Sequence, residues 1–295
     1  MTVRSPLPSY KTQLMNVSIP GVKNIIAVAS GKGGVGKSTI SVNLALAFQA
    51  MGLKAGILDA DIYGPSQALM LGTSGLSPES SDQKSLEPII QYGLQTMSIA
   101  YLVEDQTAMI WRGPMASKAL QQILQDTRWK DLDILVVDLP PGTGDIQLTL
   151  SQKIPVTGGI IVTTPQDLSL LDATRALNMF KKVGIHVFGI IENMSEFHCP
   201  HCHQITEIFG FGGAEKMAKA QAIDVLQKLP LSLLTRLSTD EGKPVVLAHP
   251  KSSEAKSYLD LAQNLVSKIQ KRPKDYRSLF GEIKIEKTSL PDTSQ

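Results

Sequence analysis

Residues 24–39 read Asn-Ile-Ile-Ala-Val-Ala-Ser-Gly-Lys-Gly-Gly-Val-Gly-Lys-Ser-Thr, and this stretch decides the fold. Its first six residues are an apolar run that predicts a short buried strand. Gly31, four further residues and Gly36-Lys37-Ser38 complete the phosphate-loop pattern G-x-x-x-x-G-K-[ST]. Apolar residues then recur at helical spacing from Ile40 onward. A strand, a loop and a helix therefore follow one another in the order that a phosphate-binding loop needs.

The residue types of this loop suit a nucleotide. Glycines let consecutive backbone N–H groups point at phosphate oxygens, and the following helix directs its positive end at the same phosphates. We expect Lys37 to act as a catalytic residue that reaches the β- and γ-phosphates of ATP, and Ser38 to bind Mg²⁺. A glycine-rich turn without a ligand is the alternative. The predicted nucleotide-binding residues of the loop are Gly31, Lys32, Gly33, Gly34, Val35, Gly36, Lys37, Ser38 and Thr39.

The rest of the chain alternates short apolar runs with amphipathic segments. Further strands are predicted at 54–58, 133–139, 159–164, 187–192 and 224–229, with a pair of short antiparallel strands within 89–99. Helices are predicted at 37–51, 115–127, 168–183, 213–220 and 252–271, and a surface loop at 72–87. Strands that are apolar along their length and alternate with helices indicate an α/β fold, with a mainly parallel sheet and helices on both faces.

Composition sets further limits. The chain has 295 residues, a net charge of +2 and 42% hydrophobic residues, which gives no reason to expect a nucleic-acid partner. No apolar run approaches the roughly 20 residues of a membrane span, and the N-terminus lacks the apolar core of a secretory signal. We therefore expect a cytoplasmic protein that binds neither nucleic acid nor membrane. Its single P-loop ATPase domain, residues 24–271, is predicted between a flexible segment 1–23 and a flexible tail 272–295.

Candidate catalytic residues follow the predicted strands at their carboxyl ends, where parallel sheets bind ligands. Asp138 ends the run Ile-Leu-Val-Val-Asp and has the Walker B position, from which a carboxylate holds Mg²⁺ through water. Asp59 and Asp61 lie two residues apart and face the same way in an extended segment, which suggests one group near Mg²⁺ and one that orients the attacking water. A plain pair of loop acids is the alternative. Residues 139–145 predict a switch segment, or else a simple turn.

Lys32 is an unusual residue in the loop. It follows the first glycine, from where it cannot easily reach the phosphates of its own subunit. Here the loop resembles the deviant Walker A loop of the MinD, ParA and nitrogenase iron-protein ATPases, in which the early lysine crosses a dimer interface. The resemblance implies a nucleotide-dependent homodimer in which Lys32 is catalytic and Asp61 positions the water. It also implies that Asp59 lies near Mg²⁺ and that Asn193 contacts adenine. A solvated surface lysine is the other interpretation of Lys32.

Three further stretches sharpen the resemblance. Trp111-Arg112-Gly113-Pro114-Met115, the 138–145 segment, and Glu192-Asn193-Met194-Ser195 followed by Cys199-Pro200-His201-Cys202 look like the Mrp/ApbC family. These proteins are relatives of the Nubpl- and Nbp-type iron–sulfur scaffold ATPases, and the similarity runs from about residue 20 to 270. The four-cysteine motif of the Nbp-type scaffolds is missing before Asn24, and so is room for an extra N-terminal domain. We therefore expect the short, Nubpl-like form.

The only two cysteines of the chain, Cys199 and Cys202, have the spacing of two metal ligands on one turn. Two thiolates cannot complete a site with four ligands, but the two pairs of a symmetric dimer can. The family resemblance implies that these cysteines hold a bridging 4Fe–4S cluster, which the protein exchanges with a cluster assembly scaffold and with apo iron–sulfur client proteins. Zinc bound within one chain by the cysteines and nearby histidines, a redox dithiol, and simple packing are the alternatives.

Two other functions compete with an ATP-hydrolysing cluster carrier. One is a positioning ATPase of the MinD/ParA kind, with a structural zinc or dithiol at the cysteines. The last predicted helix argues against its membrane form, because Lys256 and Lys268 stand beside Glu254 and Asp260. The other is a zinc-stabilised dimer that senses nucleotide without hydrolysing it. The metal content of the protein separates this third function from the first.

Overall fold

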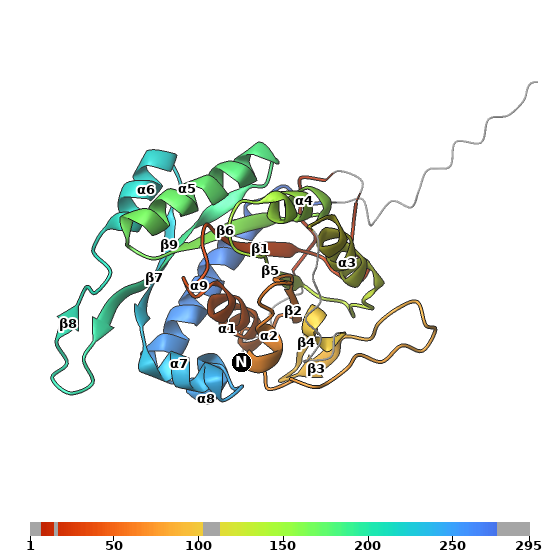
Figure 1. Ribbon diagram of the computed structural model, residues 1–295, viewed down its shortest axis with the longest axis horizontal. Coiled ribbons are helices and arrows are strands. Elements are labelled where there is room, and N and C mark those ends of the chain that lie inside the picture. Colours follow the sequence, from red (N-terminus) through yellow and green to blue (C-terminus); the bar gives the residue numbers. More distant parts are fainter. Residues whose placement is uncertain (1–6, 15–16, 103–112, 276–295) are drawn as a thin grey trace, which may run out of the picture.

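The structure is a computed structural model, and it describes residues 7–14, 17–102 and 113–275. Figure 1 shows a central sheet with helices packed against both of its sides. The predicted motif residues Trp111 and Arg112, residues 1–6 of the N-terminal segment and residues 276–295 of the tail lie outside the described residues. Among the described helices, none combines the length and the apolar character that a membrane crossing requires.

The sheet runs in the order β3-β4-β2-β5-β1-β6-β7-β8, with β9 also paired to β7. Pairs β3–β4 and β7–β8 are antiparallel, and the other pairs are parallel. The prediction of a mainly parallel α/β sheet is confirmed. The strands are β1 Ile25–Ser30, β2 Ala55–Asp59, β3 Ile89–Gln91, β4 Leu94–Ser98, β5 Ile134–Asp138, β6 Gly158–Thr163, β7 Val187–His198, β8 Ile205–Thr206 and β9 Val225–Leu231.

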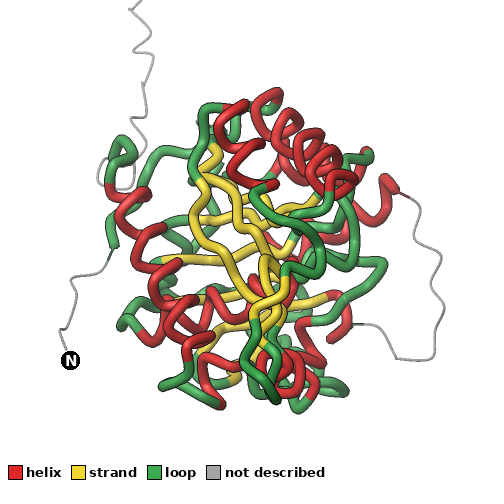
Figure 2. Tube along the Cα trace, turned by 90° about the vertical axis from the view of Figure 1, so that its left-hand side faces the viewer, coloured by secondary structure: helices red, strands yellow, loops and turns green. Residues whose placement is uncertain are grey.

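Helices cover the sheet on both faces, as the tube in Figure 2 shows from the side. One apolar cluster joins α3, α4, α5 and α6 to one face, and a second joins α1, α8 and α9 to the other. The helices are α1 Lys37–Ala50, α2 Gln67–Met70, α3 Gly113–Asp126, α4 Asp145–Lys153, α5 Asp167–Lys182, α6 Gly213–Gln221, α7 Leu233–Asp240, α8 Val245–Ala248 and α9 Ser253–Gln270, with a short 3₁₀ turn at Ile99–Tyr101.

The central strand β1 explains why the predicted strands carry no polar face. Ile25 and Ala27 belong to the first apolar cluster, whereas Ile26 and Val28 belong to the second. Successive side chains of a strand point to opposite faces, so a strand covered on both sides needs an apolar residue at every position. The core therefore consists of two layers that meet at the sheet, and the phosphate loop leaves the carboxyl end of its central strand.

Several elements differ from the predictions. The helices α2, α4, α7 and α8 and the strand β8 were not predicted. The buried side of α4 carries Gln147 and Ser151 beside Leu150, so the apolar spacing that marks a helix is weak there. Strand β7 continues beyond residue 192 to His198, although its last part is polar, because it gains partners in β8 and β9.

The N-terminal segment also differs from the prediction of a flexible 1–23. Leu7 and Tyr10 are each only 3% exposed, and Tyr10 forms a β-bridge with Lys274 of the C-terminal segment. The backbone N–H of Tyr10 donates to Asn24 Oδ1 at 3.1 Å, so a side chain at the start of the domain holds the segment that precedes it. The described parts of 1–23 are therefore packed against the core.

Candidate functional site

The phosphate loop lies between β1 and α1, at the carboxyl edge of the sheet. Its backbone turns at Gly34 and Gly36, whose φ angles of 79° and 84° lie in the region that glycine adopts readily. The loop residues 32–39 line a cavity of about 200 Å³ together with Asp61, Ser66 and Pro141. The loop, the acidic segment after β2 and Pro141 of the predicted switch segment after β5 therefore lie around one cavity, as the sequence predicts.

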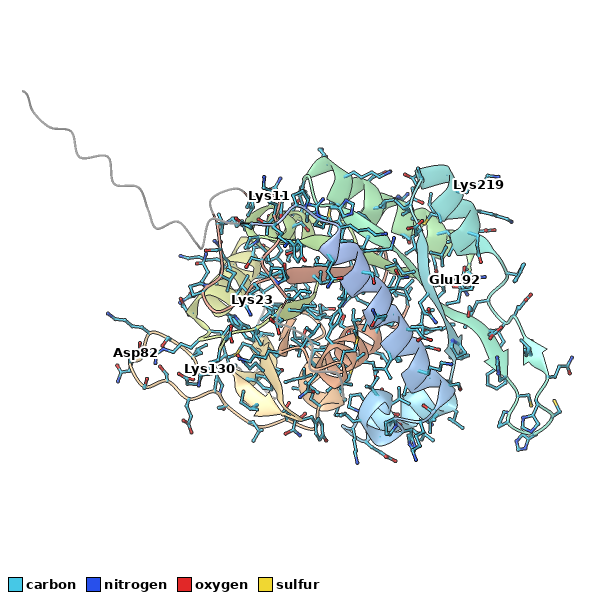
Figure 3. All side chains as sticks on the ribbon, turned by 180° about the vertical axis from the view of Figure 1, so that it is seen from behind. Lys11, Lys23, Asp82, Lys130, Glu192 and Lys219 are labelled. Carbon is cyan, nitrogen blue, oxygen red and sulfur yellow. The ribbon has the colours of Figure 1, made fainter. Side chains whose placement is uncertain are left out.

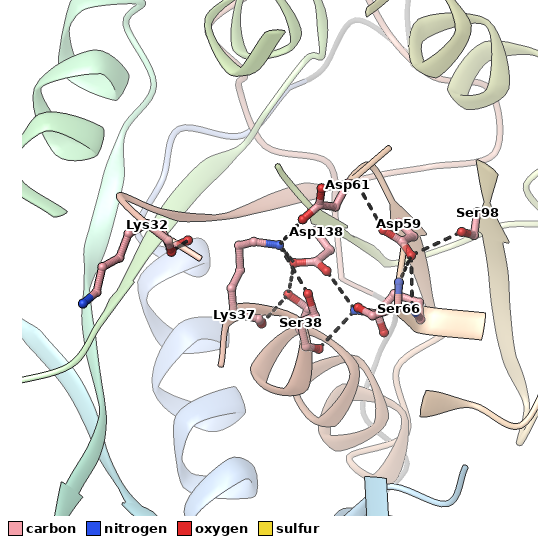
Figure 4. Close-up of polar contacts among 11 residues, drawn as sticks. Lys32, Lys37, Ser38, Asp59, Asp61, Ser66, Ser98 and Asp138 are labelled. Atoms are coloured by element: carbon pink, nitrogen blue, oxygen red, sulfur yellow. Dashed lines mark hydrogen bonds and ion pairs between the residues drawn. The ribbon is translucent and has the colours of Figure 1, made fainter. Parts of the chain in front are cut away.

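Lys37 joins the two predicted metal-binding motifs. Its Nζ lies 2.7 Å from Asp138 Oδ1, 3.3 Å from Ser38 Oγ and 3.8 Å from Asp61 Oδ2 (Figure 4). Both Lys37 and Asp138 are buried, so the ion pair neutralises two charges inside the protein. An ammonium group placed here is poised beside the cavity, from which it can turn to a phosphate.

The oxygen atoms around this ion pair suit Mg²⁺. The carboxylate of Asp138 and the hydroxyl of Ser38 are hard oxygen donors, which Mg²⁺ prefers. The side-chain oxygens Ser66 Oγ and Gln67 Oε1 are buried beside them and have no hydrogen-bond partner in the described part of the chain. The described residues contain no cluster of three or more His, Cys, Asp or Glu side chains able to hold a metal by themselves. The donor set therefore fits a Mg²⁺ ion that is held partly by phosphates and water.

Asp59 has a different environment from Asp61. It is fully buried, and its Oδ2 accepts hydrogen bonds from the backbone N–H groups of Ser66 and Gln67 at 2.9 and 3.0 Å and from Ser98 Oγ at 3.2 Å. Burial, and then the nearby Asp138, raise the pKa of Asp59 to about 7. Through these hydrogen bonds, Asp59 fixes the backbone of the loop that carries Asp61. Its position near Mg²⁺ stays a prediction.

Asp61 lies at the edge of the cavity. It is 8% exposed, and burial raises the pKa of its carboxyl group, while Lys37 acts in the opposite direction. Its backbone N–H donates to Asp59 Oδ1 at 3.1 Å, so the two acids are held in a fixed relation. The two acids therefore have different positions: Asp59 holds the backbone of Asp61 through a hydrogen bond, and Asp61 lines the cavity.

Lys32 points away from the rest of the site, as Figure 4 shows. Its Nζ lies 3.3 Å from Gln166 Oε1, at the start of α5. The phosphate-binding lysine and the early lysine of the same loop therefore have separate surroundings. This placement agrees with the predicted role of Lys32 toward a second subunit, which stays a prediction.

Asn193 contacts the phosphate loop directly. Its Nδ2 donates to the carbonyl oxygen of Val35 at 2.9 Å. A Cβ atom on Gly36 would lie 2.2 Å from the same nitrogen, so this close approach requires glycine at position 36. The amide that was predicted to contact adenine is thus placed beside the loop, and the adenine contact itself stays a prediction.

The two cysteines lie on a hairpin between β7 and β8. Figure 3 shows β7 leaving the body of the molecule beyond Glu192, with the hairpin projecting from it. Cys202 is exposed and Cys199 is partly exposed. The backbone N–H groups of Cys202 and His201 donate toward the Cys199 sulfur and lower the pKa of that thiol. A thiolate is the form that binds metal, so the hairpin favours the form of Cys199 that the predicted ligand role needs.

The histidines beside the cysteines do not complete a metal site within the described residues. His198 Nε2 instead lies 2.9 Å from Glu196 Oε1. The hairpin closes through backbone contacts, in which Cys199 donates to Gln204 O at 3.0 Å and His203 donates to Cys199 O at 2.9 Å. The structure therefore presents a pair of cysteines at the end of an arm.

Sequence reasoning missed Ser41 and Gln67. Ser41 Oγ donates to Asp138 Oδ1 at 3.0 Å, and Gln67 Nε2 donates to Asp138 Oδ2 at 2.9 Å. Ser41 follows Lys37 by one helical turn, so it could have been found from its spacing. Gln67 carries no such signal, because it reaches Asp138 from a separate short helix.

This fold and site define a P-loop NTPase, with a phosphate loop, a Walker B carboxylate and a parallel sheet that brings them together. The chain belongs to the ParA-type family described as NUBPL iron-transfer P-loop NTPases, whose family model matches residues 21–266. The resemblance drawn from the motifs is thereby confirmed.

Several relatives are similar over most of the chain. The iron-sulfur cluster carrier protein of Escherichia coli K12 is 55% identical over 251 residues, which cover 85% of this chain and 68% of that protein. The iron-sulfur cluster transfer protein NUBPL of Mus musculus is 46% identical over 275 residues, which cover 90% of this chain and 86% of that protein.

Solved structures agree with the fold. A nucleotide-binding protein from Archaeoglobus fulgidus in complex with ADP is 36% identical, with a TM-score of 0.67 over 76% of this chain and 88% of that one. The cell division ATPase MinD from Pyrococcus furiosus has a TM-score of 0.62 over 83% of this chain and 98% of that one. At 21% sequence identity, this similarity shows the fold alone.

Proposed function

We propose that this protein is a Mg²⁺-dependent ATP hydrolase that carries 4Fe–4S clusters as a homodimer in the cytoplasm. It receives clusters from an assembly scaffold and delivers them to apo-proteins. The observation that carries this proposal is the pair of Cys202, which is exposed, and Cys199, which is partly exposed, on an arm of a chain that also has a complete phosphate loop. Relatives that match most of the chain are named as iron-sulfur cluster carrier or transfer proteins, which supports the same function.

The cysteine pair supports a cluster shared by two subunits. A 4Fe–4S cluster is usually held by about four thiolates, and the arm supplies half of them. A two-fold axis near the arms brings the same two residues from the second subunit. The lowered pKa of Cys199 favours the thiolate that binds iron. Since the cluster is then exposed at the end of an arm, it is accessible to a client protein.

The phosphate loop supports hydrolysis of ATP. Lys37 leaves Asp138 and moves to the β- and γ-phosphates. Ser38 and Asp138 would hold Mg²⁺, which would neutralise part of the phosphate charge. Asp61 orients the water that attacks the γ-phosphorus as the bond to the β–γ bridging oxygen breaks. Lys32 reaches the phosphates of the partner subunit and adds positive charge where negative charge develops.

Strand β7 connects the two sites. Asn193 contacts the phosphate loop, and β7 continues from it to His198, the residue directly before Cys199. A change in the loop on ATP binding therefore reaches the cysteine arm through a continuous element. We expect the nucleotide state to change cluster retention through this strand.

Anaerobic reconstitution with iron and sulfide tests the proposal. We expect about four irons per dimer and a visible cluster absorbance, both lost in Cys199→Ala and in Cys202→Ala. His203→Ala is the matched control, because it lies on the same hairpin and should retain the cluster. One zinc per chain without a chromophore would contradict the carrier function and leave a MinD/ParA-like ATPase switch with structural cysteines. Loss of cluster transfer in Lys37→Ala would support the coupling to ATP.

A further inference from the structure

Gln67 is buried at the start of α2 and contacts three parts of the nucleotide site. Its Nε2 donates to the carbonyl oxygen of Ser38 at 3.1 Å and to Asp138 Oδ2 at 2.9 Å. Its backbone N–H donates to Asp59 Oδ2 at 3.0 Å. The side chain is fully buried. One residue therefore connects the phosphate loop, the Walker B carboxylate and the acidic loop after β2.

The bonds of Asp138 show why this contact matters. Lys37 and Ser41 both donate to Oδ1, whereas the side-chain donor to Oδ2 is Gln67. When Lys37 turns to the phosphates, Oδ1 loses its charged partner. Gln67 and Ser41 then remain to hold the carboxylate in its orientation.

The orientation of the Gln67 amide is set by its neighbours. Its nitrogen lies against two acceptors, Ser38 O and Asp138 Oδ2, so the reversed amide would place oxygen against oxygen. The other end, Oε1, is buried without a hydrogen-bond partner in the described residues. A buried acceptor without a partner is destabilising, and a water molecule bound to Mg²⁺ would supply the missing hydrogen bond.

We infer that Gln67 is a positioning residue for the Mg²⁺–nucleotide complex. It fixes the Asp138 carboxylate through Nε2 and offers Oε1 to the water around the ion. This inference rests on the Mg²⁺-dependent nucleotide binding of the proposed function. Outer groups that orient a metal-binding carboxylate typically change metal affinity by about 10- to 100-fold when they are removed.

Gln67→Met tests the inference, because it keeps the length of the side chain and removes both polar atoms. Binding of a fluorescent ADP is titrated with and without Mg²⁺ in the full chain, and ATP hydrolysis is measured against Mg²⁺ concentration. We expect the Mg²⁺ concentration for half-maximal effect to rise about tenfold, while ADP binding without Mg²⁺ changes less than twofold.

Gln91→Met is the matched control. Gln91 Nε2 donates to the carbonyl oxygen of Leu71, directly after α2, so this variant loosens the same short helix without contacting Asp138. We expect its Mg²⁺ requirement to equal that of the wild type. An equal Mg²⁺ requirement in Gln67→Met and Gln91→Met would overturn the inference, because it would reduce Gln67 to a support for α2.

A second variant covers the case in which Gln67→Met does not fold. Gln67→Asn keeps a polar amide in the buried position and withdraws it by one methylene, so the Mg²⁺ requirement should rise in the same direction. A wild-type requirement in Gln67→Asn would contradict the inference. A wild-type protein whose ADP affinity ignores Mg²⁺ would contradict the Mg²⁺ part of the proposed function instead, so the two failures are distinguishable.

Discussion

Lys37 Nζ lies 2.7 Å from Asp138 Oδ1, and both side chains are buried. The lysine that should bind phosphate and the carboxylate that should bind Mg²⁺ therefore neutralise each other within the chain. On the proposed function, Mg²⁺ arriving with a nucleotide would supply each group with a new partner of opposite charge. The pair keeps either charge from being buried without a partner before binding, and we expect its exchange to be part of the binding step.

The first prediction concerns this ion pair. Lys37→Met leaves the Asp138 carboxylate buried without its cation, so the free energy of unfolding should fall by about 3 kcal/mol. Addition of Asp138→Asn removes the uncompensated charge and should restore part of the loss. Urea unfolding of both single variants and the double variant, without nucleotide, measures this coupling. Simple addition of the two single effects would show that the pair contributes no coupling energy.

The second prediction concerns Lys32. Because its Nζ lies beside Gln166 and points away from Lys37, Lys32→Ala should keep ADP affinity within about threefold. ATP-dependent dimerisation and hydrolysis should fall at least about tenfold, since a cross-subunit lysine acts on the partner's phosphates. Analytical ultracentrifugation with ATP and a phosphate-release assay measure both. The exposed Lys84→Ala is the control, and a Lys32→Ala dimer of normal affinity would contradict the role across the interface.

The third prediction concerns the Cys199 thiol. Backbone N–H groups of Cys202 and His201 lower its pKa, so its reaction with iodoacetamide should reach half-maximal rate at a lower pH than that of a cysteine in an unfolded chain. Cys202→Ala leaves Cys199 as the sole thiol; it removes the contribution of the Cys202 side chain to the lowered pKa and keeps those of the two backbone N–H groups. The same variant in urea supplies the reference, and identical pH profiles in the folded and unfolded states would show that the hairpin does not favour the thiolate.

The sequence predicted the nucleotide half of the site because its signals are local. The glycine spacing, the lysine and the following helix occupy one stretch, and Asp138 directly follows an apolar strand. Each signal can be recognised without knowledge of distant residues, since the parallel sheet brings all strand ends to one edge. The predicted loop, acids and asparagine therefore lie together.

The parts that sequence did not reveal depend on contacts between distant segments. Gln67 reaches Asp138 across 71 positions of sequence, and no periodic pattern marks it. Strand β7 continues to His198 through polar residues because β8 and β9 supply backbone partners. Backbone pairing with these two strands forms the last part of β7, and its side chains show no apolar alternation. A prediction from the hydrophobic pattern therefore places the end of this strand too early.

The fourth prediction concerns pH. Burial raises the pKa of Asp59 to about 7, well above its ordinary value, so the folded protein binds a proton more tightly than the unfolded chain does. Stability is therefore greatest below the unfolded pKa and falls as the pH rises toward about 7, above which this loss is complete.

Asp59→Asn removes this titration. Its amide has one acceptor oxygen in place of two, so it also loses part of the contacts with the backbone N–H groups of Asp61, Ser66 and Gln67, and the variant itself does not titrate in this range. The stability of the variant relative to the wild type should therefore increase from pH 5 to pH 7 and level off above. Urea unfolding at each pH, without Mg²⁺ or nucleotide, measures the difference, and a constant difference across this range would exclude Asp59 as the titrating group.

The fifth prediction concerns the N-terminal segment. Asn24 is buried, accepts from Tyr10 N–H at 3.1 Å, and donates from Nδ2 to Pro8 O at 2.9 Å and Asp133 O at 3.0 Å. Asn24→Ala leaves these groups without partners, which should lower the free energy of unfolding by about 2 kcal/mol. Proteolysis within the segment should also become faster, because the amide is one of the groups that tie the segment to the core, together with the Leu7 N–H that donates to Asp133 and the buried side chains of Leu7 and Tyr10. Asn264→Ala, which loses one partly buried contact to Leu226 O at 3.3 Å, is the control. Equal protease resistance in both variants would show that apolar packing of the segment suffices to hold it.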